Sequence, residues 1–210
     1  MRVALFGGTF DPPHVGHIGI ATAAADAFQL DRVLFAPAGR QPLKTDAAPT
    51  AFADRLAMVR LACAEDARFS ASEIDAPRPD GVPNYTVNTL TALRKSMPEA
   101  EIFSLIGADS LLSLPHWKEP KLLLELAEWI VAARPGFPLE DLSKLGFTPL
   151  ERSRIHMLKT DYDVAATDLR ERLHKGDPCV EMLLPAVVNY IAAHSVYTQK
   201  CANETFPDAG

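Results

Sequence analysis

The sequence predicts an α/β protein built on one doubly wound parallel sheet, and three observations carry this prediction. Short apolar runs, typical of buried strands, alternate along the chain with longer segments of helical character. Successive strands joined by a helix are parallel, because the crossover returns the chain to the same end of the sheet. A glycine-bearing turn, Gly7-Gly8-Thr9, follows the first apolar run, at the kind of junction where open α/β sheets hold anionic ligands.

Length and composition fit one such domain. The chain has 210 residues, a net charge of −6 and a pI near 5.5, and this acidity argues against a large nucleic-acid interface. Cys63, Cys179 and Cys201 are too far apart in sequence for a close-spaced metal or redox pair, so we expect reduced thiols. No signal-like or membrane-spanning apolar segment is evident. We therefore expect a cytoplasmic protein with no membrane or nucleic-acid partner. The sequence leaves open whether it forms a homo-oligomer.

The first half of the chain yields four elements. A strand over Val3–Phe6 precedes an alanine-rich helix over Ile18–Ala27, and a second strand follows over Arg32–Pro37. An amphipathic helix over Asp54–Ala62 supplies apolar positions to the core. Arg55 could serve a site, but we favour a place on the solvated face of this helix.

The second half continues the alternation without a linker or repeat. Four more strands are predicted, over Phe69–Ile74, Glu101–Ile106, Glu128–Ala133 and Ile155–Leu158. Further helices are expected to begin near Asn84, Val164 and Leu184. We expect a single domain over residues 1–198 and a disordered tail over residues 199–210.

The first turn has features of a phosphate site. Two adjacent glycines let backbone N–H groups approach an anion, and the following helix start adds a partial positive charge. His14 and His17 flank Gly16 at the head of that helix, where two imidazoles three residues apart can face one side. The turn has neither the three spaced glycines of the dinucleotide fingerprint nor the Gly-Lys-Ser/Thr ending of the phosphate loop.

The whole stretch from Gly7 to His17, Gly-Gly-Thr-Phe-Asp-Pro-Pro-His-Val-Gly-His, resembles the His-x-Gly-His signature of the nucleotidyltransferase superfamily. In its longer form it resembles the bacterial nicotinate-nucleotide adenylyltransferases, and the resemblance extends over about residues 1–198. It implies a Rossmann-like fold and ATP-binding roles for the residues of this turn. Those residues are Gly7, Gly8, Thr9, Phe10, His14, Gly16 and His17.

A second segment, Val164-Ala165-Ala166-Thr167-Asp168-Leu169-Arg170, resembles the family's Ile-Ser-Ser/Ala-Thr-x-x-Arg motif. The resemblance implies that Thr167 and Arg170 bind the ATP phosphates, with His14, His17 and Arg170 as the catalytic residues. Ala165 stands where the family has serine, so one hydroxyl donor is missing. Such a hydrogen bond contributes about 0.5–1.5 kcal/mol, so we expect weaker phosphate contacts and retained activity.

Three further segments resemble the family's acceptor site. Asn84-Tyr85-Thr86-Val87-Asn88-Thr89-Leu90 is similar to Ser-Tyr-Thr-x-x-Thr-Leu, Gly107-Ala108-Asp109-Ser110 to Gly-x-Asp-Ser, and Ala133-Arg134-Pro135-Gly136 to the end of a family strand. Together with Trp117 and a loop lysine, they imply a site for nicotinate mononucleotide. The implied binding residues are Lys44, Thr86, Gly107, Asp109, Trp117 and Arg134.

Simpler interpretations stay open at these positions. Thr86 also suits a plain helix cap, Asp109 a cap of the helix after it, and Trp117 a satellite core. Lys44 also suits a solvated loop. A carboxylate is favoured at a helix N-terminus, which fits an acidic pyridine at Thr86. A positively charged pyridine ring gains a cation–π interaction on an indole such as Trp117.

The resemblance implies transfer of the adenylyl group of ATP to nicotinate mononucleotide, giving deamido-NAD and pyrophosphate in NAD biosynthesis. No dense carboxylate cage indicates a resident metal, so Mg²⁺ is expected to arrive with ATP. The same fold could also serve a different acceptor, such as nicotinamide mononucleotide or pantetheine phosphate, or cytidylyl transfer to a polyol phosphate. The sequence further leaves open a catalytically silent nucleotide-binding homologue and a tRNA-synthetase fragment.

Overall fold

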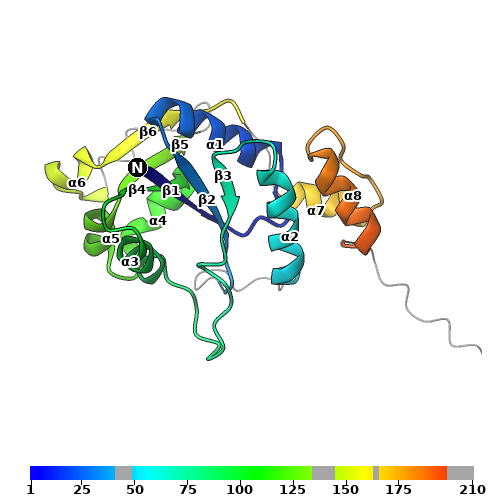
Figure 1. Ribbon diagram of the computed structural model, residues 1–210, viewed down its shortest axis with the longest axis horizontal. Helices are drawn as coiled ribbons and strands as arrows, with labels where there is room; N and C mark the ends of the chain where they lie inside the picture. The colour runs from blue at the N-terminus through cyan, green and yellow to red at the C-terminus, as the bar shows by residue number, and fades with distance from the viewer. Residues whose placement is uncertain (41–48, 134–144, 163–165, 198–210) are drawn as a thin grey trace, which may run out of the picture.

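The computed structural model describes residues 1–40, 49–133, 145–162 and 166–197, and its centre is one six-stranded sheet (Figure 1). The strand order is β3-β2-β1-β4-β5-β6, and every neighbouring pair is parallel. The strands are β1 (Arg2–Gly8), β2 (Arg32–Pro37), β3 (Phe69–Ala71), β4 (Glu101–Gly107), β5 (Glu128–Ala133) and β6 (Ile155–Lys159). The order reverses beside β1, which has β2 on one side and β4 on the other, so the sheet has a topological switch point there.

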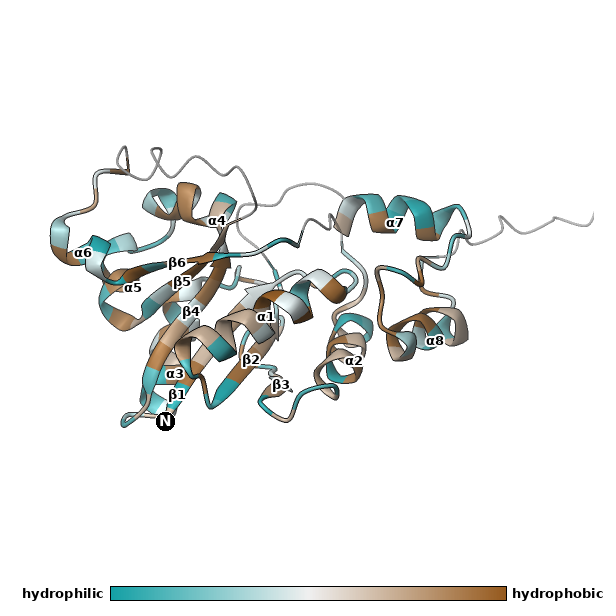
Figure 2. Ribbon diagram, turned by 90° about the horizontal axis from the view of Figure 1, so that it is seen from above, coloured by the Kyte–Doolittle hydropathy of each residue, from teal (hydrophilic) through white to brown (hydrophobic). Residues whose placement is uncertain are grey.

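Helices cover both faces of this sheet (Figures 1 and 2). They are α1 (Val15–Phe28), α2 (Phe52–Cys63), α3 (Thr86–Ser96), α4 (Ala108–Ser113), α5 (Pro120–Leu126), α6 (Pro149–Ser153), α7 (Ala166–His174) and α8 (Pro185–His194), with a 3-10 turn η1 (Leu114–His116). Within the described ranges, no helix has the length and apolar character needed to cross a membrane.

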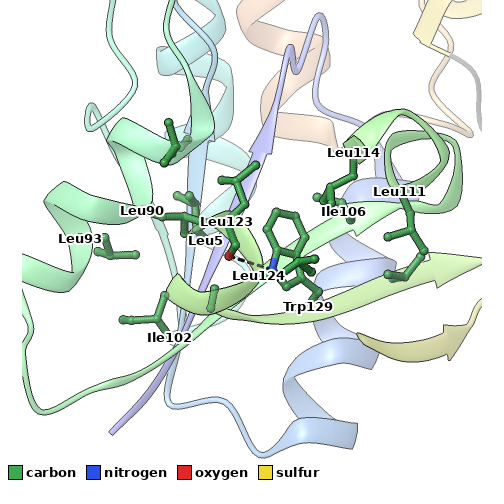
Figure 3. Close-up of a cluster of buried hydrophobic side chains, with 14 of the residues drawn as sticks. Leu5, Leu90, Leu93, Ile102, Ile106, Leu111, Leu114, Leu123, Leu124 and Trp129 are labelled. Atoms are coloured by element: carbon green, nitrogen blue, oxygen red, sulfur yellow. Dashed lines mark hydrogen bonds between the residues drawn. The ribbon is translucent and has the colours of Figure 1, made fainter. Parts of the chain in front are cut away.

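The strands alternate their side chains between two cores. On one face, Leu5 and Ile102 pack with α3 and α5 around the fully buried Trp129, whose indole N–H donates to the Leu123 carbonyl at 3.2 Å (Figure 3). On the other face, Phe6 and Phe35 pack against the small residues of α1. Because both faces of the sheet are buried, the strands read as continuous apolar runs.

A third cluster joins the C-terminal helices to the rest. Apolar residues of α7 and α8, such as Leu169 and Val187, pack with Met58 of α2, and both figures place these three helices together (Figures 1 and 2). The Val15 N–H at the head of α1 donates to the Met182 carbonyl at 2.9 Å. The C-terminal part of the chain therefore lies against the turn that follows β1.

The predicted doubly wound parallel sheet is confirmed, with shifts at element ends. The strand predicted over Phe69–Ile74 ends at Ala71. The Ser72 N–H makes the last hydrogen bond to β2, at the Phe35 carbonyl, and the chain then turns at residues 73–76. The first helix begins at Val15, inside the motif, and not at Ile18. The predictions for Lys44, Arg134, Ala165 and the tail over residues 199–210 lie outside the described residues.

Candidate active site

A cavity of about 580 Å³ opens at the carboxyl ends of the central strands. Its floor comes from Gly7 and Gly8 of β1, Ala36 of β2, and Ser104 and Ile106 of β4. This is the switch point of the sheet, where open α/β folds bind ligands, and the volume suits a small organic molecule.

Three residues predicted for the acceptor line this cavity from separate elements. Thr86 is the first residue of α3, Asp109 lies in the first turn of α4, and Trp117 follows η1. The Trp117 indole N–H donates to the Ser113 hydroxyl at 2.9 Å, and its ring meets Trp129 edge-on with centroids 6.3 Å apart. These contacts fix the orientation of a half-buried ring whose surface contributes to the cavity wall.

The cavity wall includes charged and polar residues that the sequence did not single out. The Lys118 ammonium lies 4.6 Å from the centroid of the Tyr85 ring, and both residues line the cavity. Asp75 accepts a hydrogen bond from the Thr89 hydroxyl at 2.9 Å, and burial raises the pKa of Asp75 to about 6. Lys118 follows Trp117 directly, which was a usable signal, whereas nothing local marks Asp75.

The two glycines of the first turn have different reasons to be glycine. A Cβ on Gly7 would meet no atom within 4 Å, so this residue leaves room on the cavity side. A Cβ on Gly8 would lie 3.0 Å from Cζ of Phe10, whose ring is 2% exposed and packs edge-on against Phe6. Gly8 thus makes room for a core phenylalanine. Phe10 has only its backbone to offer a nucleotide.

The two histidines form a close pair at the start of α1, with their ring planes inclined by 31°. His14 is the N-cap and His17 the third helical residue, and their ring centroids are 3.6 Å apart. The backbone N–H of His14 donates to Nδ1 of His17 at 3.2 Å, so the neutral His17 ring carries its proton on Nε2. Burial, and next the neighbouring His14, lower the pKa of His17 well below 6.5. His17 is therefore a neutral hydrogen-bond donor at pH 7. Neither ring lines the cavity itself; both flank the turn beside it.

The start of α7 is attached to the same turn. Arg170 donates from Nη1 to the Asp11 carbonyl at 2.9 Å and from Nη2 to the Thr167 hydroxyl at 3.2 Å. Gly16 is buried in the first turn of α1. The fold therefore brings the two predicted ATP-binding segments together, although they lie more than half the chain apart in sequence.

The assignment of Arg55 to a solvated helix face is wrong. Its side chain is 1% exposed, and its guanidinium donates to the carbonyls of Thr9, Ala38 and Thr50 at 2.7, 2.9 and 2.9 Å. Burial lowers the pKa of Arg55, and the nearby Asp11 opposes that shift. The arginine is buried because three loop carbonyls at the end of the sheet point at one spot, which helical periodicity cannot show.

Among the described residues predicted for the acceptor, Gly107 is placed beside the cavity and does not line it. Gly107 is exposed at the end of β4, and a Cβ there would meet nothing within 4 Å, whereas its neighbours Asp109 and Ser110 are lining residues. In the part of the chain that the structure describes, no group of three or more His, Cys, Asp or Glu residues is placed to hold a metal ion.

Comparison with known proteins agrees with this geometry. The Cytidylyltransferase-like family matches residues 5–172. A probable nicotinate-nucleotide adenylyltransferase of Thermomicrobium roseum is 41% identical over 93% of this chain and 91% of its own length. One from Thermus thermophilus is 40% identical over 94% of this chain and 100% of its own.

Solved structures show the same fold at low identity. The Plasmodium falciparum nicotinic acid mononucleotide adenylyltransferase complexed with NaAD superimposes with a TM-score of 0.75 at 15% identity, over 93% of this chain and 97% of the other. Its complex with APC gives a TM-score of 0.73 at 16% identity, over 93% and 96% of the two chains. The fold, the paired imidazoles beside the switch-point cavity and the close similarity over nearly the whole chain lead to one conclusion: this chain belongs to the nicotinate-nucleotide adenylyltransferase family.

Proposed function

We propose that this protein transfers the adenylyl group of ATP to nicotinate mononucleotide, forming deamido-NAD and pyrophosphate in NAD biosynthesis. One observation carries the proposal: a cavity walled by a helix start at Thr86 and an oriented indole at Trp117 adjoins a turn that bears two imidazoles. The curated relatives carry the same activity in their names.

The acceptor occupies the cavity. Its pyridine ring stacks on Trp117, its carboxylate meets the N-terminus of α3 at Thr86, and its ribose meets Asp109. Lys118 adds a positive charge at the same wall. We include Lys44, Arg134 and Gly107 as further acceptor contacts, as the family resemblance implies.

ATP lies over the β1–α1 turn, with its phosphates toward the head of α1. A phosphate oxygen of the acceptor attacks the α-phosphorus, the bond from that phosphorus to the bridging oxygen breaks, and pyrophosphate leaves. The ionised acceptor phosphate is already a nucleophile, so the protein positions the reactants and stabilises charge. His17 donates from Nε2, and His14, Thr167 and Arg170 share the phosphate contacts.

The nucleotide enters as its Mg²⁺ complex. The described donors near the turn are imidazole, hydroxyl, guanidinium and backbone N–H groups, which suit phosphate oxygens more than a hard cation. We therefore assign the metal to the substrate.

Pyrophosphate release measured with MgATP and each candidate acceptor tests the proposal. We expect turnover with nicotinate mononucleotide to exceed that with nicotinamide mononucleotide, and none with pantetheine phosphate. Release that is fastest with pantetheine phosphate, or absent with every acceptor, would refute the proposed function.

A further inference from the structure

A buried carboxylate in the β1–α1 turn has no role in the chemistry above. Asp11 is 3% exposed, and its Oδ2 accepts a hydrogen bond from the Thr50 N–H at 3.0 Å. Its Oδ1 accepts one from the Tyr197 hydroxyl at 2.5 Å, across 186 positions of sequence. Its main-chain carbonyl is the acceptor for Arg170. One residue of the ATP-binding turn therefore joins α7, the chain before α2 and the C-terminal segment.

The segment after α8 places the Tyr197 hydroxyl at Asp11. After α8 the backbone turns back through left-handed conformations at Ser195 and Tyr197, with φ of 51° and 67°. Tyr197 is 7% exposed within the apolar cluster of α2, α7 and α8. The backbone carbonyl of Tyr197 is hydrogen-bonded to Nδ1 of His174 in α7. Burial, and next the Asp11 charge, raise the pKa of Tyr197, so the hydroxyl stays protonated and donates.

We propose that Tyr197 is a positioning residue for ATP: by holding Asp11, it fixes the turn that leads into His14 and whose Asp11 carbonyl accepts a hydrogen bond from Arg170 of α7. The proposal rests on the proposed function, because it takes Arg170 and the histidines as the groups that meet the phosphates. Removing the hydroxyl leaves one oxygen of a buried carboxylate without its donor, and a buried polar group that loses its partner is costly. The turn relieves that cost by shifting, which moves the Asp11 carbonyl away from Arg170.

The position of Asp11 predicts a larger effect on ATP than on the acceptor. The acceptor residues Thr86, Asp109 and Trp117 lie on α3, α4 and the segment after η1, and none of them bonds to Asp11 or Tyr197 in the described structure. Gly7 and Gly8 of the turn also line the cavity, so a loss of positioning raises KM for ATP more than KM for nicotinate mononucleotide.

The neighbouring helix supplies a matched control. Tyr190 of α8 also donates its hydroxyl to an aspartate, Asp54 of α2, at 2.9 Å, and it is half-buried. Tyr190→Phe deletes the same atom from the same chemical pair, but Asp54 lies in α2 and outside the turn. We expect Tyr197→Phe to raise KM for ATP about tenfold, the effect of losing one hydrogen bond to a charged group. Tyr190→Phe should leave both KM values within twofold of wild type.

Hydrogen exchange on the wild-type protein provides a second test that needs no variant to fold. MgATP alone should slow exchange in the peptide that contains residues 190–197 as well as in the turn, and nicotinate mononucleotide alone should not. Equal KM effects in the two tyrosine variants, a parallel rise of both substrates' KM in Tyr197→Phe, or no ATP-dependent protection of the C-terminal peptide would each overturn the inference. Wild-type protein that releases no pyrophosphate would instead refute the proposed function.

Discussion

Replacing Arg55 by methionine should cost more stability than any surface substitution on the same helix. The change removes a buried guanidinium and leaves the carbonyls of Thr9, Ala38 and Thr50 without their donor. A hydrogen bond to a charged group contributes about 1.5–3 kcal/mol, which would give about 5–9 kcal/mol for three additive bonds. Such losses are rarely additive, because water and neighbouring groups relax into the gap, so we expect about 3–5 kcal/mol.

Equilibrium urea unfolding measures this loss, with Arg60→Met as the control. Arg60 lies on the same helix, but its ion pair with Glu73 is exposed on both sides, at 59% and 60%, so its removal should cost less than about 1 kcal/mol. The comparison holds if the slope of the free energy of unfolding against urea is the same in both variants. A loss below about 1 kcal/mol for Arg55→Met, or equal losses in the two variants, would refute the reasoning.

Three further predictions follow from single contacts. The folded pKa of His17 is lowered below the unfolded value of 6.5, so the unfolded state binds more protons in acid, and the free energy of unfolding should fall as pH drops below about 6.5. His17→Gln should show a smaller fall in the free energy of unfolding between pH 7 and 5, and parallel profiles would contradict this. Asp75 has the opposite effect in both proteins, so its contribution cancels in the comparison. A Cβ on Gly19 would lie 2.0 Å from the Tyr162 ring. Gly19→Ala should therefore add about 1 kcal/mol of helix stability only in a Tyr162→Ala background. Equal effects in both backgrounds, measured by urea unfolding, would rule out the contact. Lys118→Met should reduce kcat/KM for nicotinate mononucleotide, so that its ratio to kcat/KM for nicotinamide mononucleotide falls about fivefold. An unchanged ratio would show that Lys118 does not contribute to selectivity.

The sequence predicted most of the fold, because the strands carry unambiguous apolar runs. It also predicted that His14 and His17 share one side of a helix start, since residues three apart on a helix must do so. Placing Thr86 at the start of α3 and Thr167 at the start of α7 needed only local signals of helix boundaries.

The rest depended on contacts between segments far apart in the chain. The helical pattern around Arg55 gave no sign that carbonyls from three loops converge on it. Tyr197 lies 186 residues from Asp11, and no local pattern pairs them. Gly8 appeared to open the backbone to a phosphate, but the Phe10 ring that occupies the space is visible only in three dimensions.

The edge-on contact between Trp117 and Trp129 gives the protein an internal optical reporter. The chain has two tryptophans, and their rings lie within 6.3 Å of each other, so excitation absorbed by one is shared with the other. Trp129 is buried in the core, whereas Trp117 lines the cavity, so a molecule that covers Trp117 alters the emission of both. Occupancy of this cavity can therefore be followed by intrinsic fluorescence, without a label and without turnover.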